Sequence, residues 1–550
     1  MKLSPLEDHS ALFQVPGTIV LSDATETDRL DLKRNPKGDI ILSPQPSEDP
    51  NDPLNWPTYK KLTVVIILMF GSCVCASTIG PLLSASLFVL SEDLHRPLSD
   101  ITLTTGYTLL ASGCAGPLVS SIARKLGKRP AFIFCSFMGL LGSIIGAVSA
   151  SYNGLLAARV VQGFATCAYE SLVISVVGDI FFVHQRGLYS SFMIFTLNCV
   201  SNMSPIVCGP ITNNLGWRWL FILLAIIIGV QLALCFLFVP ETTYRRDPRY
   251  NTDETANTNL EELTKIEHQH NEVLDEPIAD RDKSVREVTG IPIPKKKTWL
   301  QELKVYNGIM SDESILAMFA APFLSCTNLA VFWMVIVSGG VTSFYVAASY
   351  VVAQIFSPPP YLLNASQVGY TFLGPFIGGI LGTLAVGAIS DSIALWLTKR
   401  NKGIYEPEFR LVPILLGLAA GAGFIGFGYV TSMSGSVYTA SFLWGLSIFG
   451  VTFVVVPSSA YIIDAFRDLS HEAFIAAMMF KNFIFYGYST FMNDWTASAG
   501  PHAAFYTFGG ATFALVLTTV IVYIWGKRYR SFWHRHNMFE KLHIRSQVEM

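Results

Sequence analysis

Apolar runs of about bilayer length recur along this chain and are separated by polar segments. An α-helix needs about 20 apolar residues to cross the hydrocarbon core of a membrane, so each run predicts one spanning helix. One run is too long for a single span, and we expect its first part, before Pro322, to lie along the membrane surface. The runs fall at roughly 62–90, 99–122, 130–150, 154–182, 188–211 and 217–240, and then at 318–356, 366–395, 409–431, 435–465, 472–497 and 502–526.

This pattern predicts an all-α polytopic membrane protein with 12 transmembrane helices in two six-helix bundles. A long, polar and charged segment separates the two groups of runs, and a loop of this length between two hydrophobic bundles is typical of a linker. The predicted parts are a tail at 1–60, a first bundle at 61–240, a central loop at 241–317, a second bundle at 318–526 and a second tail at 527–550.

Basic residues gather in alternate short loops, and such loops remain on the cytoplasmic side of a membrane. The loops at 124–129 and 399–402 are rich in Lys and Arg, whereas those at 151–153 and 432–436 contain none. We therefore expect both termini and the central loop to be cytoplasmic. The sequon at Asn364 would then face outside and is a glycosylation candidate.

Composition supports the membrane assignment and excludes several other classes. The chain is 51% hydrophobic and only 14% charged, whereas soluble domains carry about 25% charged residues. The nine cysteines all lie in apolar runs without a CxxC pair, and no phosphate-binding GxxxxGK[ST] loop is present. We expect no enzyme activity, no metal, no cofactor, no nucleic-acid partner and a monomer. The basic run at 294–304 would either rest on an anionic inner leaflet or serve as a solvated linker.

One run, from Arg159 to Asp179, carries charge where lipid would exclude it. A charged side chain at mid-bilayer costs about 3 kcal/mol, so Glu170 is expected to face a polar cavity or a partner. With 3.6 residues per turn, Arg159, Thr166 and Glu170 share nearly one helix face. We interpret this stripe as the wall of a transport pathway. The alternative is that Glu170 makes only a buried contact between helices.

The other candidate pathway residues are polar or aromatic side chains within apolar runs. Aromatic faces bind cations with about 1–2 kcal/mol when desolvated, although Trp and Tyr near span ends are also typical of interfacial belts. The asparagines would line a cavity or join helices by hydrogen bonds. For Lys481 we favour the role of electrostatic partner over substrate contact. These candidates are Tyr107, Tyr169, Asn198, Asn202, Trp333, Tyr345, Tyr350, Lys481 and Tyr486.

Several short motifs occur in a characteristic order. SSIARKLGKRP fills the second loop, LLAARVVQG opens the fourth run, SPIVCGPI lies in the fifth, and FVPETTYRRD closes the sixth. Over residues 50–530 this combination resembles the major facilitator superfamily, specifically its fungal drug:proton antiporter branch with twelve spans. The segment IILSPQPSEDPNDPLNWP, the Tyr169–Glu170 pair and KRNKGIYEPEFRL are more similar to the sub-branch that moves cations and polyamines.

The resemblance assigns a gate at the cytoplasmic ends of the helices. Lys128 and Arg129 match the end of the family's second-loop motif, but Arg124 replaces its aspartate. Asp391 occupies the equivalent place after the eighth span, so the second half retains the carboxylate that the first half has lost. Asp179 would pair with Arg124 or Arg129 and hold the inner mouth shut.

The same resemblance implies roles inside the bundle. Arg159, with Gln162 and Gly163, matches the fourth-span motif that the family uses in proton movement. In the fifth span the family's antiporter motif falls on 204–209, where two of its glycines are missing. We therefore expect a looser helix contact there.

Three functions are compatible with this sequence. The favoured one is a proton-coupled secondary transporter of organic cations, polyamines included, at the plasma membrane. A proton and a small cationic substrate would compete for Glu170 while the two halves rock about a midplane site. The second is an exporter of neutral drugs or metabolites in which Glu170 only carries the proton. The third is a non-transporting membrane sensor that signals through the central loop.

Overall fold

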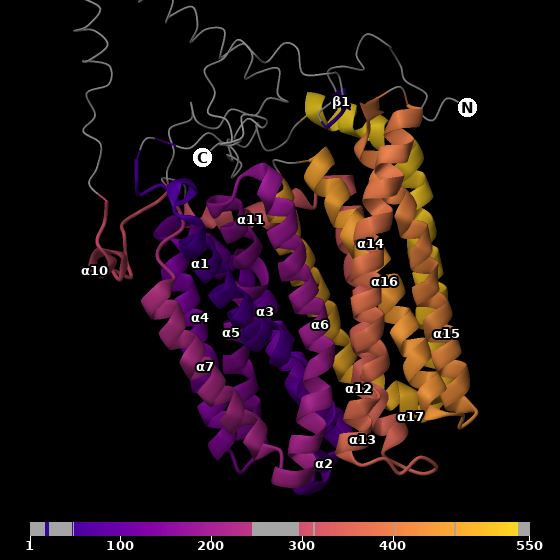
Figure 1. Ribbon diagram of the computed structural model, residues 1–550. Helices are drawn as coiled ribbons and strands as arrows, with labels where there is room; N and C mark the ends of the chain where they lie inside the picture. The colour runs from indigo at the N-terminus through magenta and orange to yellow at the C-terminus, as the bar shows by residue number, and fades with distance from the viewer. Residues whose placement is uncertain are drawn as a thin grey trace, which may run out of the picture.

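The computed structural model describes residues 17–20, 47, 49–244, 296–311, 314–401, 403–466 and 469–536. Most of the tail predicted at 1–60, most of the central loop at 241–317, and residues 537–550 lie outside this part. Figure 1 shows long helices running side by side, with the first half of the chain (α1 to α7) next to the second half (α11 to α17). The predicted all-α polytopic fold is confirmed, and a pair of two-residue strands is its only β-structure among the described residues.

Within the described residues, the first half contains six long helical stretches. The predicted run at 62–90 is not one helix, because it changes to π-helical geometry after Gly71 and then breaks at Gly80–Pro81. The elements are α1 (Thr58–Gly71) with its π-helical continuation η4 (Ser72–Thr78), η5 (Pro81–Leu83), α2 (Leu87–Asp93), α3 (Leu98–Leu126), α4 (Lys128–Val148), α5 (Tyr152–Ile180), α6 (Val183–Leu215) and α7 (Arg218–Phe238).

The second half begins with a short helix and a cap. The surface segment expected before Pro322 stays a prediction, but Pro322 itself lies inside α11, and the long run is divided at Asn328, whose side chain accepts hydrogen bonds from the amides of Ala330 and Val331. The elements are α11 (Ile315–Ser325), α12 (Leu329–Phe356), α13 (Ala365–Tyr370), α14 (Leu373–Arg400), η7 (Pro407–Gly417), α15 (Leu418–Ser432), α16 (Val437–Ala465) and α17 (Ser470–Arg535).

Nine helices in the described part are long and apolar enough to cross a membrane. The longest, α17, is interrupted at Gly500, whose φ of +78° is not helical, so it comprises the two runs predicted at 472–497 and 502–526. The helices α3 and α6 are long but fall outside this set of nine. The number of 12 spans therefore stays a prediction.

The two halves meet along two helix seams. In one seam α3 packs against α17, and in the other α6 packs against α13 and α14. At the second seam, a Cβ on Gly209 would lie 2.5 Å from the carbonyl oxygen of Ala365, and one on Gly369 would lie 2.5 Å from that of Pro205. The looser contact expected from the missing fifth-span glycines is therefore wrong, because the remaining Gly209 faces Gly369 at close range.

A small sheet ties the amino-terminal tail to the second half. Strand β1 (Ile19–Val20) pairs antiparallel with β2 (Ile404–Tyr405), with Ile19 opposite Tyr405. In Figure 1, β1 and α11 lie at one end of the long helices, whereas α2 and α13 lie at the other. The tail therefore precedes the first half in sequence but contacts the second half in space.

Candidate functional site

An ion pair near the middle of two long helices joins the halves. Glu170 projects from α5 and its Oε1 contacts Nζ of Lys481, which projects from α17. The side chain of Glu170 is 17% exposed and that of Lys481 is 29% exposed. Because neither charge is fully sealed, other polar groups can reach this pair, and the apolar surroundings strengthen the attraction between the two charges.

The same stretch of α17 makes further polar and aromatic contacts. Asn482 Nδ2 lies 3.5 Å from Ser112 Oγ on α3, which is a second link between the halves. One turn further on, the rings of Tyr107 and Tyr486 lie 5.3 Å apart. The hydroxyl of Tyr350, on α12, is 3.5 Å from the carbonyl oxygen of Phe485. Three predicted aromatic candidates thus gather within about two turns of Lys481.

A third link between the halves lies on the opposite seam. The hydroxyl of Tyr345 donates a hydrogen bond to Oδ1 of Asn202, joining α12 to α6. The ring of Tyr345 also packs 5.8 Å from that of Trp444 within the second half. The structure therefore brings together two of the predicted candidates, Asn202 and Tyr345. The side chain of Asn198 lies outside the described part.

Arg159 and Thr166 have a role different from the expected pathway wall. Arg159 is fully buried and donates to the carbonyl oxygens of Ile79, at 2.7 Å, and Gly80, at 3.1 Å. Thr166 Oγ1 donates to the carbonyl oxygen of Cys75, at 3.1 Å. These carbonyls belong to the π-helical and broken part of the first span, where regular helical bonding is lost. The polar stripe on α5 therefore repairs irregular backbone, and only Glu170 reaches the other half.

Tyr169 and Trp333 turn into their own halves and away from Glu170. The hydroxyl of Tyr169 lies 2.6 Å from Ser136 Oγ and 3.2 Å from Gln231 Nε2. Neighbouring residues on a helix point about 100° apart, and here Tyr169 contacts α4 and α7 whereas Glu170 contacts α17. Trp333 Nε1 donates to Thr518 Oγ1, at 2.9 Å, inside the second half. Both predicted site residues are thus packing residues.

The expected gate residues form different pairs. Asp179 binds Lys128 within the first half. Arg124 instead reaches across to Glu472 on α17, with Nη1 and Oε1 3.1 Å apart and both side chains at most 6% exposed. Arg129 donates to backbone carbonyls, including that of Leu303 at 3.2 Å. The cross-half contact at this end therefore uses Arg124 and Glu472, and Asp179 serves to join α4 to α5.

The second half contains a similar arrangement of charges. Asp391 and Arg410 are 3.2 Å apart, and Arg410 also binds Asp464 at the end of α16. The carboxylate that the resemblance implied at Asp391 is therefore used inside the second half, between α14 and η7. Burial and the neighbouring Asp464 carboxylate raise the pKa of the Tyr405 phenol, so its hydroxyl remains a donor to Asp464.

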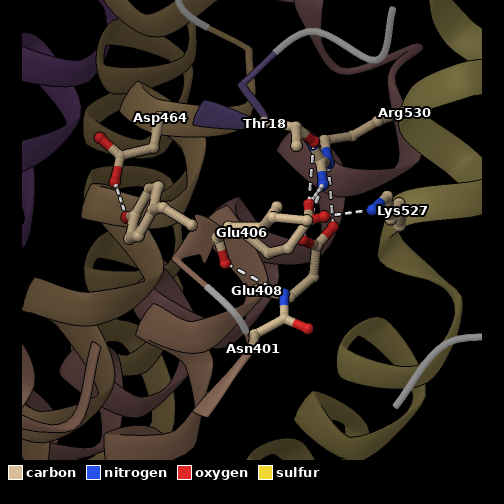
Figure 2. Close-up of polar contacts among 9 residues, drawn as sticks. Thr18, Asn401, Glu406, Glu408, Asp464, Lys527 and Arg530 are labelled. Atoms are coloured by element: carbon tan, nitrogen blue, oxygen red, sulfur yellow. Dashed lines mark hydrogen bonds and ion pairs between the residues drawn. The ribbon is translucent and has the colours of Figure 1, made fainter. Parts of the chain in front are cut away.

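Figure 2 shows how two further carboxylates close this end of the second half. Glu406 and Glu408 both lie 2.8 Å from Arg530, and Glu406 also binds Lys527. Thr18 of the tail donates to Glu406 Oε2, at 2.9 Å. The cluster joins η7 to the end of α17, so these charges hold elements of one half together and do not form a transport site.

Sequence reasoning missed Glu472 and Asn482 as contacts between the halves. Glu472 is the first residue of the apolar run at 472–497, and Asn482 lies within this run, directly after Lys481. A polar residue beside an intramembrane lysine was therefore the available signal. In the described part, no group of three or more His, Cys, Asp or Glu side chains is placed to hold a metal ion.

Comparison with known proteins settles the family. The sequence model of the Major Facilitator Superfamily matches residues 65–489. The chain belongs to the major facilitator superfamily. As a member of this superfamily it is a membrane transporter and not an enzyme, and the fungal branch suggested by its motifs agrees with its relatives.

Several fungal proteins are among the relatives of this superfamily member. It is 24% identical to an uncharacterized MFS-type transporter of Schizosaccharomyces pombe, over 99% of this chain and 97% of that protein. It is equally 24% identical to protein HOL1 of Saccharomyces cerevisiae, over 94% of each, and to the efflux pump radE of Floropilus chiversii, over 83% and 78%.

Solved structures of the superfamily share the fold. The peptide transporter POT in complex with sulfate aligns with a TM-score of 0.56 at 14% identity, covering 87% of this chain and 96% of that one. The xylose transporter XylE from E. coli aligns with a TM-score of 0.54 at 13% identity, covering 84% and 97%. At this identity the likeness extends to the fold alone.

Proposed function

We propose that this transporter moves organic cations, polyamines included, across the plasma membrane by alternating access coupled to protons. The observation that carries the proposal is the Glu170–Lys481 pair between the halves. Intramembrane ionisable residues are costly and mark substrate or proton pathways. The basic loops support an orientation with both termini in the cytoplasm, and the substrate and the proton are the small partners of this site.

The pair offers a simple coupling mechanism. Glu170 can hold the ammonium of Lys481, the ammonium of a substrate, or a proton, but one such charge at a time. When substrate or proton replaces Lys481, an ionic link between α5 and α17 is lost, and the halves are freer to move apart. Both side chains are partly shielded from water, so leaving either charge without a partner is unfavourable, and the exchange of partners would determine which conformations are accessible.

Aromatic groups near the pair suit an organic cation. Tyr107 and Tyr486 lie on α3 and α17, and their rings are in contact across the seam. An aromatic face attracts an ammonium group by about 1–2 kcal/mol when water is excluded. A polyamine would place one ammonium on Glu170 and a second against this tyrosine pair.

The test is uptake of radiolabelled spermidine into proteoliposomes with and without an imposed pH gradient. We expect uptake to respond to the gradient and to be abolished by Glu170→Gln, which retains the shape of the side chain but not its charge. Asp494→Asn is the control, because Asp494 is an exposed acid on α17, the helix that carries Lys481. Gel filtration and thermal unfolding verify that each variant is folded.

Normal uptake by Glu170→Gln with unchanged pH dependence would refute the mechanism. A second candidate, an exporter of neutral drugs or metabolites, is favoured by the relative named as an efflux pump. In that case Glu170 carries only the proton, so excess unlabelled spermine would leave transport of the neutral compound unchanged. Binding without any flux would indicate the non-transporting sensor.

A further inference from the structure

A cavity of about 550 Å³ lies outside the interface between the halves. Its walls come from the end of the amino-terminal tail, the beginning of α1, the end of α7 and the short helix α10 (Trp299–Glu302) of the central loop. Figure 1 shows α10 on the outer flank of the first half, toward the end where β1 lies. The lining residues therefore belong to the outer flank of the first half, away from the two seams between the halves.

Specific bonds hold the central loop against the first half and so build this cavity. Lys60 on α1 and Glu302 on α10 are paired at 2.6 Å. Trp299 Nε1 donates to the carbonyl oxygen of Leu237, at 3.2 Å, at the end of α7. The amide of Lys297 donates to Oδ1 of Asn51, at 2.8 Å. Three separate segments are thereby fixed around one space.

The charge of the cavity favours an anion. One acidic residue, Glu302, lines the cavity. The basic residues that line it are Lys60, Arg129, Lys296 and Lys297. Arg129 is only 1% exposed and is held by hydrogen bonds from Nη2 to the carbonyl oxygens of Phe236, at 2.7 Å, and Leu303, at 3.2 Å, so it contributes a fixed positive charge to the wall. The ammonium groups of Lys296 and Lys297 are on exposed side chains, and a phosphate oxygen would form charge-assisted hydrogen bonds with them.

The remaining lining matches the boundary of a bilayer. Tyr59 is 74% exposed and Trp299 is 53% exposed, and aromatic side chains of this kind are enriched at membrane interfaces. Leu237 and Phe238, at the end of the apolar helix α7, are also exposed. A ligand with a phosphate at one end and acyl chains at the other would place the first among the basic groups and the second along α7.

We propose that this cavity binds the phosphate-bearing headgroup of an anionic phospholipid from the leaflet that faces the central loop. Phosphate is the shared chemistry, and it has two sources, the lipid and free inorganic phosphate. The arrangement commits the site to the lipid, because exposed apolar residues lie directly beside the basic ones. The inference does not depend on which substrate is transported, and only the name of the leaflet depends on the proposed orientation.

The test uses the full chain, purified in detergent and depleted of lipid, with the thermal unfolding temperature as the readout. The added probes are dioctanoyl phosphatidylserine, dioctanoyl phosphatidylcholine and inorganic phosphate. The variant Lys296→Gln/Lys297→Gln removes two exposed charges from the cavity. The matched control, Lys399→Gln/Arg400→Gln, removes two exposed charges from the end of α14 in the second half.

We expect phosphatidylserine to raise the unfolding temperature of the parent and of the control. Each basic residue near an anionic lipid contributes about fivefold to binding, so the cavity variant needs about thirtyfold more lipid for half of the effect. An unchanged titration of the cavity variant overturns the proposal. Equal stabilisation by phosphatidylcholine, or by inorganic phosphate at the same concentration, overturns it as well.

Discussion

At the scale of single residues, Glu241 organises the beginning of α4. Its carboxylate accepts hydrogen bonds from the amides of Lys128, at 2.9 Å, and Arg129, at 3.1 Å. Negative charge is favourable at a helix amino terminus. Gly127 precedes this turn with a φ of +100°, and a Cβ there would lie 2.2 Å from Glu241 Oε2. The second-loop motif SSIARKLGKRP and the sixth-run motif FVPETTYRRD, which lie far apart in sequence, therefore form one helix cap together.

We accordingly expect Gly127→Ala to destabilise the protein by about 1–3 kcal/mol, because alanine is strained at this φ and would displace the capping carboxylate. Gly229→Ala in α7 is the control. A Cβ there has Leu140 as its neighbour at 3.9 Å, and alanine favours helix by up to about 1 kcal/mol. Thermal unfolding in detergent compares the two. Equal unfolding temperatures would contradict the capping role.

Single residues also show what a sequence can and cannot indicate about the site. Glu170 is visible because a charge within an apolar run has few explanations. The position of Lys481 in an apolar run favours electrostatic pairing, but the sequence does not indicate that its partner, Glu170, lies in the other half of the chain. Arg159 and Thr166 share a helix face with Glu170, but periodicity does not reveal which neighbour each position meets. Their partners are carbonyls freed by a π-helix, which hydropathy cannot detect.

At the scale of elements, most apolar runs correspond to helices within a few residues, and the errors concern how helices are interrupted. The first span turns π-helical, and α12 begins at the Asn328 cap, whereas Pro322 is accommodated inside α11. Such interruptions depend on side chains that satisfy backbone groups, and hydrophobicity does not encode this. The close contact between α6 and α13 is not predictable from the fifth-span motif either, because that motif gives no information about Gly369 on the opposite helix.

This seam is open to a direct test. Gly369→Leu would push α13 away from the carbonyl of Pro205, and overpacking of this kind costs about 1–3 kcal/mol. We expect turnover in proteoliposomes to fall about tenfold, because the larger side chain strains the close contact between α6 and α13. Gly510→Leu is the control, since a side chain at this exposed position meets open space. Equal turnover of the two variants would show that the seam tolerates separation.

At the scale of the whole molecule, links between the halves occur at different depths. Arg124 and Glu472 pair toward the end where β1 lies, Glu170 and Lys481 pair near the middle, and α6 meets α13 toward the other end. Rocking of two bundles about a central site requires such links to open in turn. The resemblance of the motifs led to the fold and the family. The residues that form these links are far apart in sequence, and a single amino-acid sequence does not indicate which distant residues are in contact.

The link at the β1 end should control how easily the halves separate there. Glu472→Gln removes the charge that faces Arg124, so we expect faster hydrogen–deuterium exchange at the end of α3 and the beginning of α17. Loss of one partner of a pair this buried costs about 1–3 kcal/mol, which is enough to increase the exchange rate severalfold. Asp494→Asn, on the same helix, should leave these segments unchanged. Similar exchange in both variants would mean that the ion pair does not fasten the halves.

If the substrate is an organic cation, as proposed, the ammonium of Lys481 occupies on Glu170 the place that the substrate ammonium would take. An attached ammonium acts at an effective concentration in the millimolar range or above, so a simple monovalent ion at lower concentration is a poor competitor. A cation with several positive charges makes additional contacts and can displace the Lys481 ammonium from Glu170. Selectivity among cations would then depend on the strength of the intramolecular pair as much as on the shape of the surrounding space.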